Sequence, residues 1–81
     1  MPTVKIYSTP TCVYCNIAKQ FFNDNKVKYE EYNVAEDLTK RSEMVEKSGQ
    51  MGVPVICIST TGGEEIIVGF QEDKISKLLG L

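Results

Sequence analysis

The chain has 81 residues, 42% hydrophobic and 25% charged, which is the composition of an ordinary globular protein. Because a domain of this size buries only a modest part of its surface, we expect a single domain over residues 1–81 without a large enclosed cavity. Nine Lys and Arg against eleven Asp and Glu give a formal charge of -2, which argues against a nucleic-acid partner.

The sequence also argues against a membrane partner. Residues 1–6 contain no charged segment followed by a long apolar one, and 18 consecutive apolar residues occur nowhere. We therefore expect a cytoplasmic protein.

The first elements predicted along the chain are a strand and a helix. Apolar and polar residues alternate over 3–7, which is typical of a strand with one buried face, and Pro10 ends it. From residue 14 to about 25, apolar residues recur at steps of three and four, which predicts an amphipathic helix. The residues expected on its buried face are Ile17, Ala18, Phe21 and Phe22.

A second strand and a second helix follow. Residues 28–34 are aromatic and β-branched, but Glu30 and Glu31 interrupt them, so we expect a strand at or near a sheet edge. Residues 36–48 are predicted to be an exposed helix that ends at Gly49. Its expected buried stripe is Leu38, Met44 and Val45, and its expected ion pairs are Glu36–Lys40, Asp37–Arg41 and Glu43–Lys47.

The C-terminal part is predicted to be a hairpin and a closing helix. Residues 55–58 are apolar on both faces and indicate a central strand, which pairs with 65–68 across a turn at Gly62 and Gly63. Residues 71–79 place their apolar side chains on one helical face. The order β-α-β-α-β-β-α predicts an α/β protein of thioredoxin-like fold, with a four-stranded mixed sheet flanked by three helices.

Two cysteines, Cys12 and Cys15, are three residues apart at the junction between the first strand and the first helix. A thiolate is the species that attacks a disulfide, and a helix N-terminus lowers the pKa of a thiol from its free value of about 8.5. The placement therefore predicts a redox pair in which Cys12 is the nucleophile. Cys15, one turn into the helix and less accessible, would attack the resulting mixed disulfide and release the reduced substrate.

Other roles for the cysteines are weaker. Two reduced cysteines can pack as small hydrophobic residues, but this position at a strand-to-helix junction favours chemistry. A structural zinc site needs four ligands, and the chain has no His and only one further cysteine, Cys57, so we expect no metal. Cys57 lies within an apolar strand and is expected to be a buried, unreactive thiol.

Three stretches of the sequence, residues 7–15, 52–55 and 68–70, resemble the signature stretches of glutaredoxins. The resemblance covers essentially the whole chain and is strongest to short bacterial glutaredoxin-like proteins with a dithiol site. It implies a thiol-disulfide oxidoreductase that reduces protein disulfides and glutathione mixed disulfides. It also implies a cis peptide bond before Pro54, whereas only about one X-Pro bond in twenty is cis in folded proteins.

The resemblance further implies that glutathione is the reducing co-substrate, with no bound cofactor. The chain departs from the family at Thr9, where a Lys is usual, at Val68, where a second Gly is usual, and at Gln71, where an Asp is usual. Charged contacts to the carboxylates of glutathione are therefore missing, although backbone groups at Val53 and at the start of the last helix remain. The residues implied to bind substrate are Thr9, Thr11, Tyr14, Val53, Pro54, Gly69, Phe70 and Gln71.

Two alternatives stay open. Val68-Gly69-Phe70 and the missing Lys also resemble redoxins that take electrons from thioredoxin reductase and donate them to ribonucleotide reductase. Some glutaredoxin relatives instead carry an iron-sulfur cluster between two copies, mostly those with one active-site cysteine, and the presence of Cys15 argues against that class. We expect a monomer whose partners are glutathione and disulfide-containing proteins.

Overall fold

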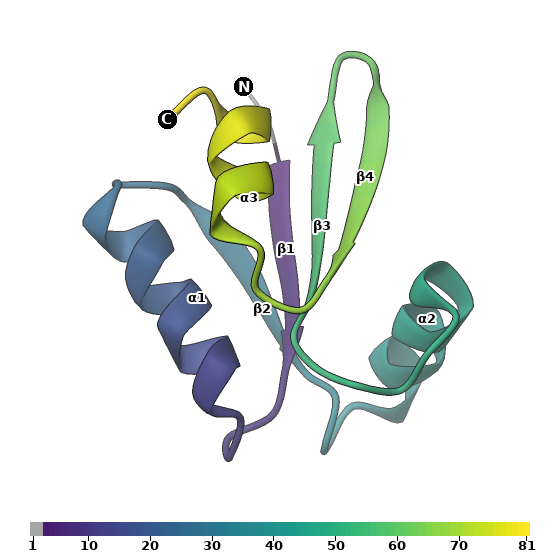
Figure 1. Cartoon of the computed structure of the whole chain (residues 1–81). Helices are drawn as coiled ribbons and strands as arrows, with labels where there is room; N and C mark the ends of the chain where they lie inside the picture. Colours follow the sequence, from purple (N-terminus) through teal and green to yellow (C-terminus); the bar gives the residue numbers. More distant parts are fainter. Residues whose placement is uncertain (1–2) are drawn as a thin grey trace.

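A computed structural model describes residues 3–81; the first two residues of the expected domain lie outside this range. A mixed sheet forms the centre of the fold and three helices cover its two faces (Figure 1). The elements are β1 (Thr3–Ser8), α1 (Val13–Asp24), β2 (Tyr29–Asn33), α2 (Leu38–Ser48), β3 (Val55–Thr60), β4 (Gly63–Val68) and α3 (Glu72–Leu79).

The strand order is β2-β1-β3-β4, with β1 and β2 parallel and the other two pairs antiparallel. The thioredoxin-like fold is thereby confirmed, as are the edge position of β2 and the central position of β3. In the antiparallel pairs, Val55 lies opposite both Tyr7 and Val68. The end of β1, the start of β3 and the end of β4 therefore meet at one end of the sheet.

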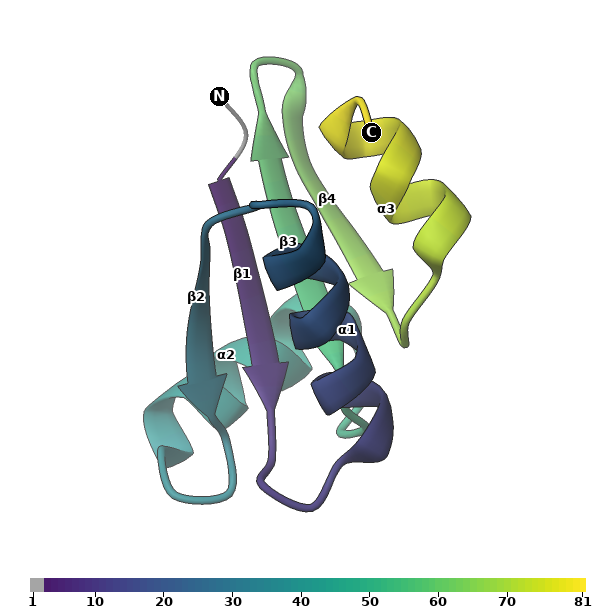
Figure 2. The same cartoon turned by 90° about the vertical axis from the view of Figure 1, so that its left-hand side faces the viewer.

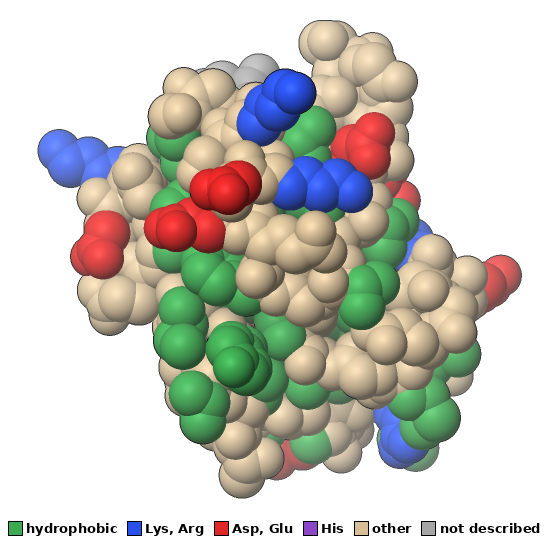
Figure 3. All heavy atoms as spheres, in the orientation of Figure 1, with side chains coloured by type: hydrophobic (Ala, Val, Ile, Leu, Met, Phe, Trp, Pro, Cys, Tyr) green, Lys and Arg blue, Asp and Glu red, His purple; other side chains and the backbone are tan. Residues whose placement is uncertain are grey.

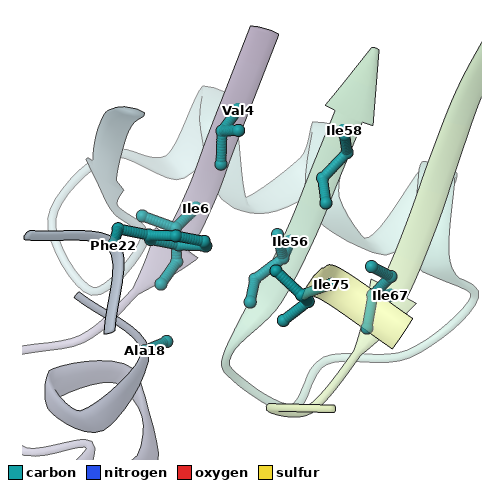
Figure 4. Packing of buried hydrophobic residues seen from close by; sticks show 8 residues of the cluster. All are labelled: Val4, Ile6, Ala18, Phe22, Ile56, Ile58, Ile67 and Ile75. Carbon is teal, nitrogen blue, oxygen red and sulfur yellow. The ribbon is translucent and has the colours of Figure 1, made fainter. Parts of the chain in front are cut away.

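Helices α1 and α3 cover one face of the sheet (Figure 2). The apolar side chains of β1, β3 and β4 on this face pack against one face of each helix, which fixes the position of α1 relative to β1. Figure 4 shows the fully enclosed members of this cluster: Val4, Ile6, Ala18, Phe22, Ile56, Ile58, Ile67 and Ile75.

Helix α2 covers the opposite face, where Met44 packs against Tyr7, Val55 and Cys57. The hydroxyl of Tyr7 donates a hydrogen bond of 2.7 Å to Oε1 of Glu43. Burial and this bond raise the pKa of Tyr7, while the same bond, with Lys40 and Lys47 nearby, lowers the pKa of Glu43 despite its partial burial.

Two residues expected in the buried stripes are exposed. Leu38 is 68% exposed, because six residues of about 100° each turn it about 120° around α2 from the buried Met44. Ile17 is 44% exposed, since the face of α1 that meets the sheet is centred on Ala18 and Phe22. Both predictions of burial were wrong.

Helix α2 begins two residues later than predicted. Asp37 caps it, accepting a hydrogen bond of 3.0 Å from the backbone N–H of Lys40, so the first helical residue is Leu38. Of the three expected ion pairs, Glu43–Lys47 forms, at 3.9 Å, and among residues 3–81 the other two do not. Asp37 is instead engaged as a cap, which leaves Arg41 without it.

The last helix begins at Glu72, one residue after its predicted start, because Gln71 is the N-cap residue. In the hairpin before it, β4 begins at Gly63 rather than 65, and the positive φ of 127° at Gly63 is a conformation that favours glycine. Within residues 3–81, no helix has the length and apolarity needed to cross a membrane.

Candidate redox site

Cys12 and Cys15 form a disulfide at the N-terminus of α1, with their Cα atoms 5.2 Å apart. Cys12 is the N-cap residue, in extended conformation, and its Sγ accepts a hydrogen bond of 3.1 Å from the backbone N–H of Cys15. Its backbone is also fixed, because its N–H donates to Thr9 O and its C=O accepts from the N–H of Asn16, each at 3.2 Å. The sulfur of Cys12 therefore occupies the position of a capping oxygen.

The two cysteines differ in accessibility. Cys15 is fully enclosed, while Cys12 is partly exposed. The first turn of α1 carries no acidic side chain that would oppose the positive end of the helix dipole. A negative sulfur at position 12 is thus favoured by backbone N–H groups, and only this sulfur is open to an approaching disulfide.

A hydrogen-bonded carboxylate links the two elements that carry the cysteine loop. Oε2 of Glu31 on β2 accepts two hydrogen bonds, one of 2.8 Å from the hydroxyl of Ser8 and one of 2.6 Å from Nζ of Lys19. Ser8 is buried at the end of β1, and Lys19 lies one turn after Cys15 on α1. These bonds, that of Lys19 first, lower the pKa of Glu31 against its partial burial. The sequence interpretation missed this cluster. The one sequence feature that pointed to it is the charged residue Glu31 within a half-buried strand.

The peptide bond between Val53 and Pro54 is cis, as the resemblance implied. Pro54 is buried directly before β3, and the β1–β3 register places it at the end of the sheet where the cysteine loop begins. Its C=O accepts a hydrogen bond of 2.8 Å from the N–H of Gly69. No hydrogen bond found among residues 3–81 uses the backbone N–H or C=O of Val53.

The segment after β4 holds three more of the expected site residues. Gly69 has a positive φ of 80°, which favours glycine at this turn, and its N–H reaches Pro54. The ring of Phe70 lies edge-on to that of Phe21 on α1, with centroids 5.6 Å apart. The side-chain amide of Gln71 donates a hydrogen bond of 2.9 Å to Val68 O, so this side chain turns back onto its own loop.

The remaining expected residues flank Cys12. Thr9 contributes its C=O to the N–H of Cys12, whereas Thr11 and Tyr14 are exposed, Tyr14 by 65%. The backbone thus joins the cysteine loop, the cis-proline segment and the turn at Gly69 at one end of the sheet, while their substrate contacts remain predictions.

Cys57 is separate from this site. It is 1% exposed and belongs to the cluster beneath α2, on the other face of the sheet. Burial raises the pKa of its thiol, with the charge of Glu64 acting in the same direction. The burial that the sequence predicted for this thiol is thereby confirmed.

Comparisons with known proteins agree with this geometry. The glutaredoxin family model matches residues 4–62. A glutaredoxin-like 8.6 kDa protein in the rubredoxin operon of Clostridium pasteurianum is 43% identical over 76 residues, covering 94% of this chain and 96% of that protein. Glutaredoxin 3 of Escherichia coli K12 is 38% identical over 58 residues, covering 72% of this chain and 70% of its own.

The fold is also similar to that of a solved structure. The thioredoxin-like protein BC3987 superposes with a TM-score of 0.79 at 30% identity, over 94% of this chain and 99% of that one. With Cys12 and Cys15 bonded at the helix N-terminus, these matches show that the chain belongs to the glutaredoxin family of thiol-disulfide oxidoreductases.

Proposed function

We propose that the protein is a dithiol reductase of protein disulfides and glutathione mixed disulfides, with Cys12 as nucleophile and Cys15 as resolving thiol. The Cys12 thiolate attacks one sulfur of the substrate, forming a mixed disulfide and releasing the first thiol. The Cys15 thiolate then attacks Cys12 Sγ and releases the second. Two glutathione molecules reduce the Cys12–Cys15 disulfide and leave as one glutathione disulfide.

The hydrogen bond from Cys15 N–H to Cys12 Sγ is the observation that carries this assignment. It stabilises a thiolate at position 12, whether Cys12 is attacking or leaving. Position 15 has the opposite character, since a fully enclosed sulfur meets a substrate only after the substrate is attached to its neighbour. The order of the two steps follows from this difference.

Glutathione is proposed as the electron donor on the basis of free backbone groups. Val53 offers an unpaired N–H and C=O beside the cis-proline, suited to pair with the cysteinyl part of a short peptide. The first N–H groups of α3 offer a place for a carboxylate. Because Thr9 and Gln71 provide no charge, we expect glutathione to bind more weakly than in family members with Lys and Asp there.

Reduction by thioredoxin reductase is the second candidate, with ribonucleotide reductase as the electron acceptor. One contact favours it: the Gln71 amide donates a hydrogen bond to Val68 O, so this side chain is turned back onto its own loop instead of extending toward a tripeptide. In either case we propose a cytoplasmic monomer without a nucleic-acid or membrane partner.

One preparation tests both candidates. NADPH oxidation is followed with bis(2-hydroxyethyl) disulfide as substrate, either with glutathione and glutathione reductase or with thioredoxin reductase. Turnover only with glutathione supports the proposal, and turnover only with thioredoxin reductase replaces it by the second candidate. An ultraviolet-visible spectrum of anaerobically purified protein serves as a control, because a cluster carrier would be brown.

A further inference from the structure

A second apolar stripe runs along the outer side of α1. Its buried stripe is Cys15, Ala18 and Phe22, and the outer one follows Val13, Ile17 and Phe21 at four-residue steps. Val13 is 67% and Ile17 44% exposed, whereas Phe21 is partly buried and packs against the core. Val13 and Ile17 therefore offer a partner an apolar contact area that the core does not use.

The outer stripe forms one wall of an open groove of about 430 Å³ between α1 and the start of α3. Phe21 and Phe70, in edge-on contact, lie in this lining, and Val13 begins it directly after Cys12. Figure 3 shows hydrophobic side chains gathered over α1, with acidic side chains above and to the left of them. The groove is thus continuous with the redox site.

Two carboxylates line the groove, Asp24 and Glu72, and Asp24 lies at the end of α1 that is farther from Cys12. Neither belongs to an ion pair among residues 3–81. Glu72 lies at the N-terminus of α3, where the helix dipole favours it. Asp24 is the last residue of α1, where the dipole disfavours an anion and no basic residue compensates. Its Oδ1 accepts a hydrogen bond of 2.8 Å from Nε2 of Gln20, one turn earlier, and among residues 3–81 no hydrogen bond uses its Oδ2.

The length of the groove indicates the size of its occupant. From Val13 to Asp24 the helix rises about 16 Å at about 1.5 Å per residue, which is the span of about five extended residues. A tripeptide bound at Val53 does not reach this far. An apolar wall followed by carboxylates is complementary to an apolar side chain followed by a cation.

We propose that this groove docks the protein substrate, specifically an extended segment that carries an apolar residue and then Lys or Arg beside its reactive cysteine. This inference rests on the proposed disulfide-reductase function. Along the helix axis, the five residues from Cys12 to Ile17 span the length of about two extended residues, and the twelve from Cys12 to Asp24 span about five. The apolar side chain therefore fits two positions from the substrate cysteine, and the cation five positions from it. The groove then sets which protein disulfides are reduced fastest.

The test uses symmetrical peptide disulfides and the reduced full-length protein. Peptides of pattern Cys-x-Leu-x-x-Arg, and the same pattern reversed, are compared with versions that carry Ser for Leu or Glu for Arg. Each reaction oxidises Cys12 and Cys15 to the disulfide and yields two peptide thiols, measured by chromatography after rapid quenching. We expect at least one orientation of the Leu and Arg peptide to react about fivefold faster than its Ser and Glu versions.

Two variants locate the preference. Ile17→Gln is expected to remove most of the advantage of Leu over Ser. Asp24→Lys is expected to reverse the preference of Arg over Glu. It loses the hydrogen bond from Gln20, but it puts a cation at a helix C-terminus, where the dipole favours it and offsets that loss. Leu38→Gln and Glu46→Lys are the matched controls, exposed positions on α2 at which the preferences stay unchanged.

A small disulfide separates the two proposals. Reduction of bis(2-hydroxyethyl) disulfide by all four variants at the starting rate shows that the redox chemistry is intact, and its absence in the starting protein refutes the proposed function. If the small disulfide is reduced but the peptides show no preference, or the α2 controls lose it equally, the docking proposal is wrong. A dimer in sedimentation that Ile17→Gln dissociates would assign the groove to a second copy instead and overturn it.

Discussion

The backbone N–H of Cys15 points at the sulfur of Cys12 from 3.1 Å, which makes the resolving residue part of the capping site of the attacking one. The cap of α1 and the reactivity of Cys12 are therefore one structural feature. Any change in the first turn of this helix acts on both.

The first prediction concerns the acidity of Cys12 in the reduced protein. We expect its pKa to lie below the free-cysteine value of about 8.5, because the N-terminal backbone of α1 stabilises the thiolate. No Lys, Arg or His occurs between Lys5 and Lys19 in the sequence. Iodoacetamide alkylation rates measured against pH give the value, and a midpoint at or above that of free cysteine would contradict the capping role.

The second prediction separates the two cysteines. Cys12→Ser should abolish all disulfide reduction, and it should not unfold α1, because serine is a favoured N-cap residue. Cys15→Ser should keep activity on glutathione mixed disulfides, which need only the nucleophile and an external thiol, and lose activity on protein disulfides.

Turnover assays on both substrate types measure this difference. Cys15→Ala is the matched variant, since it avoids placing a hydroxyl at a fully enclosed position. Equal losses at positions 12 and 15 on mixed disulfides would refute the assigned roles.

The order of the elements could be predicted from periodicity alone, but the width of each buried face could not. An amphipathic pattern says that Ile17 and Ala18 lie near one side of a helix, and only the position of the helix over the sheet decides that Ala18 is enclosed and Ile17 exposed. The same holds for Leu38 and Met44 on α2. The residue that the pattern misplaced on α1 is part of the groove proposed for docking.

The cysteine pair was predictable because its chemistry depends on local sequence, a strand followed by a loop and a helix. The cluster of Ser8, Lys19 and Glu31 was not, because it depends on how β2 aligns with β1, a register that brings Glu31 within hydrogen-bond distance of Ser8, 23 positions earlier. The cis bond at Pro54 followed only from the family resemblance, since base rates favour trans.

The third prediction concerns stability at acid pH. The pKa of Glu43 is lowered in the fold, first by the hydrogen bond from Tyr7, so its contribution is present above the unfolded value of about 4.3 and is lost as pH falls through the folded value. Tyr7→Phe should therefore lower the free energy of unfolding at pH 7 by about 1 to 2 kcal/mol, and by less at pH 3.

Urea unfolding at the two pH values measures the effect. Glu46→Gln, at an exposed position on the same helix, is the control and should change neither value by more than about 0.5 kcal/mol. A loss for Tyr7→Phe that is the same at both pH values would mean that the charge of Glu43 does not contribute to the bond.

The last prediction concerns the expected low affinity for glutathione. Charge-assisted hydrogen bonds contribute about 1.5 to 3 kcal/mol each when enclosed and much less when exposed, and this chain lacks them at Thr9 and at the exposed Gln71. Thr9→Lys with Gln71→Asp should therefore lower the glutathione concentration for half-maximal rate severalfold, without changing the rate at saturation. Gln71→Asn, which adds no charge, is the control and should leave it unchanged. An unchanged concentration in the double variant would mean that backbone contacts at Val53 and at the start of α3 alone limit binding.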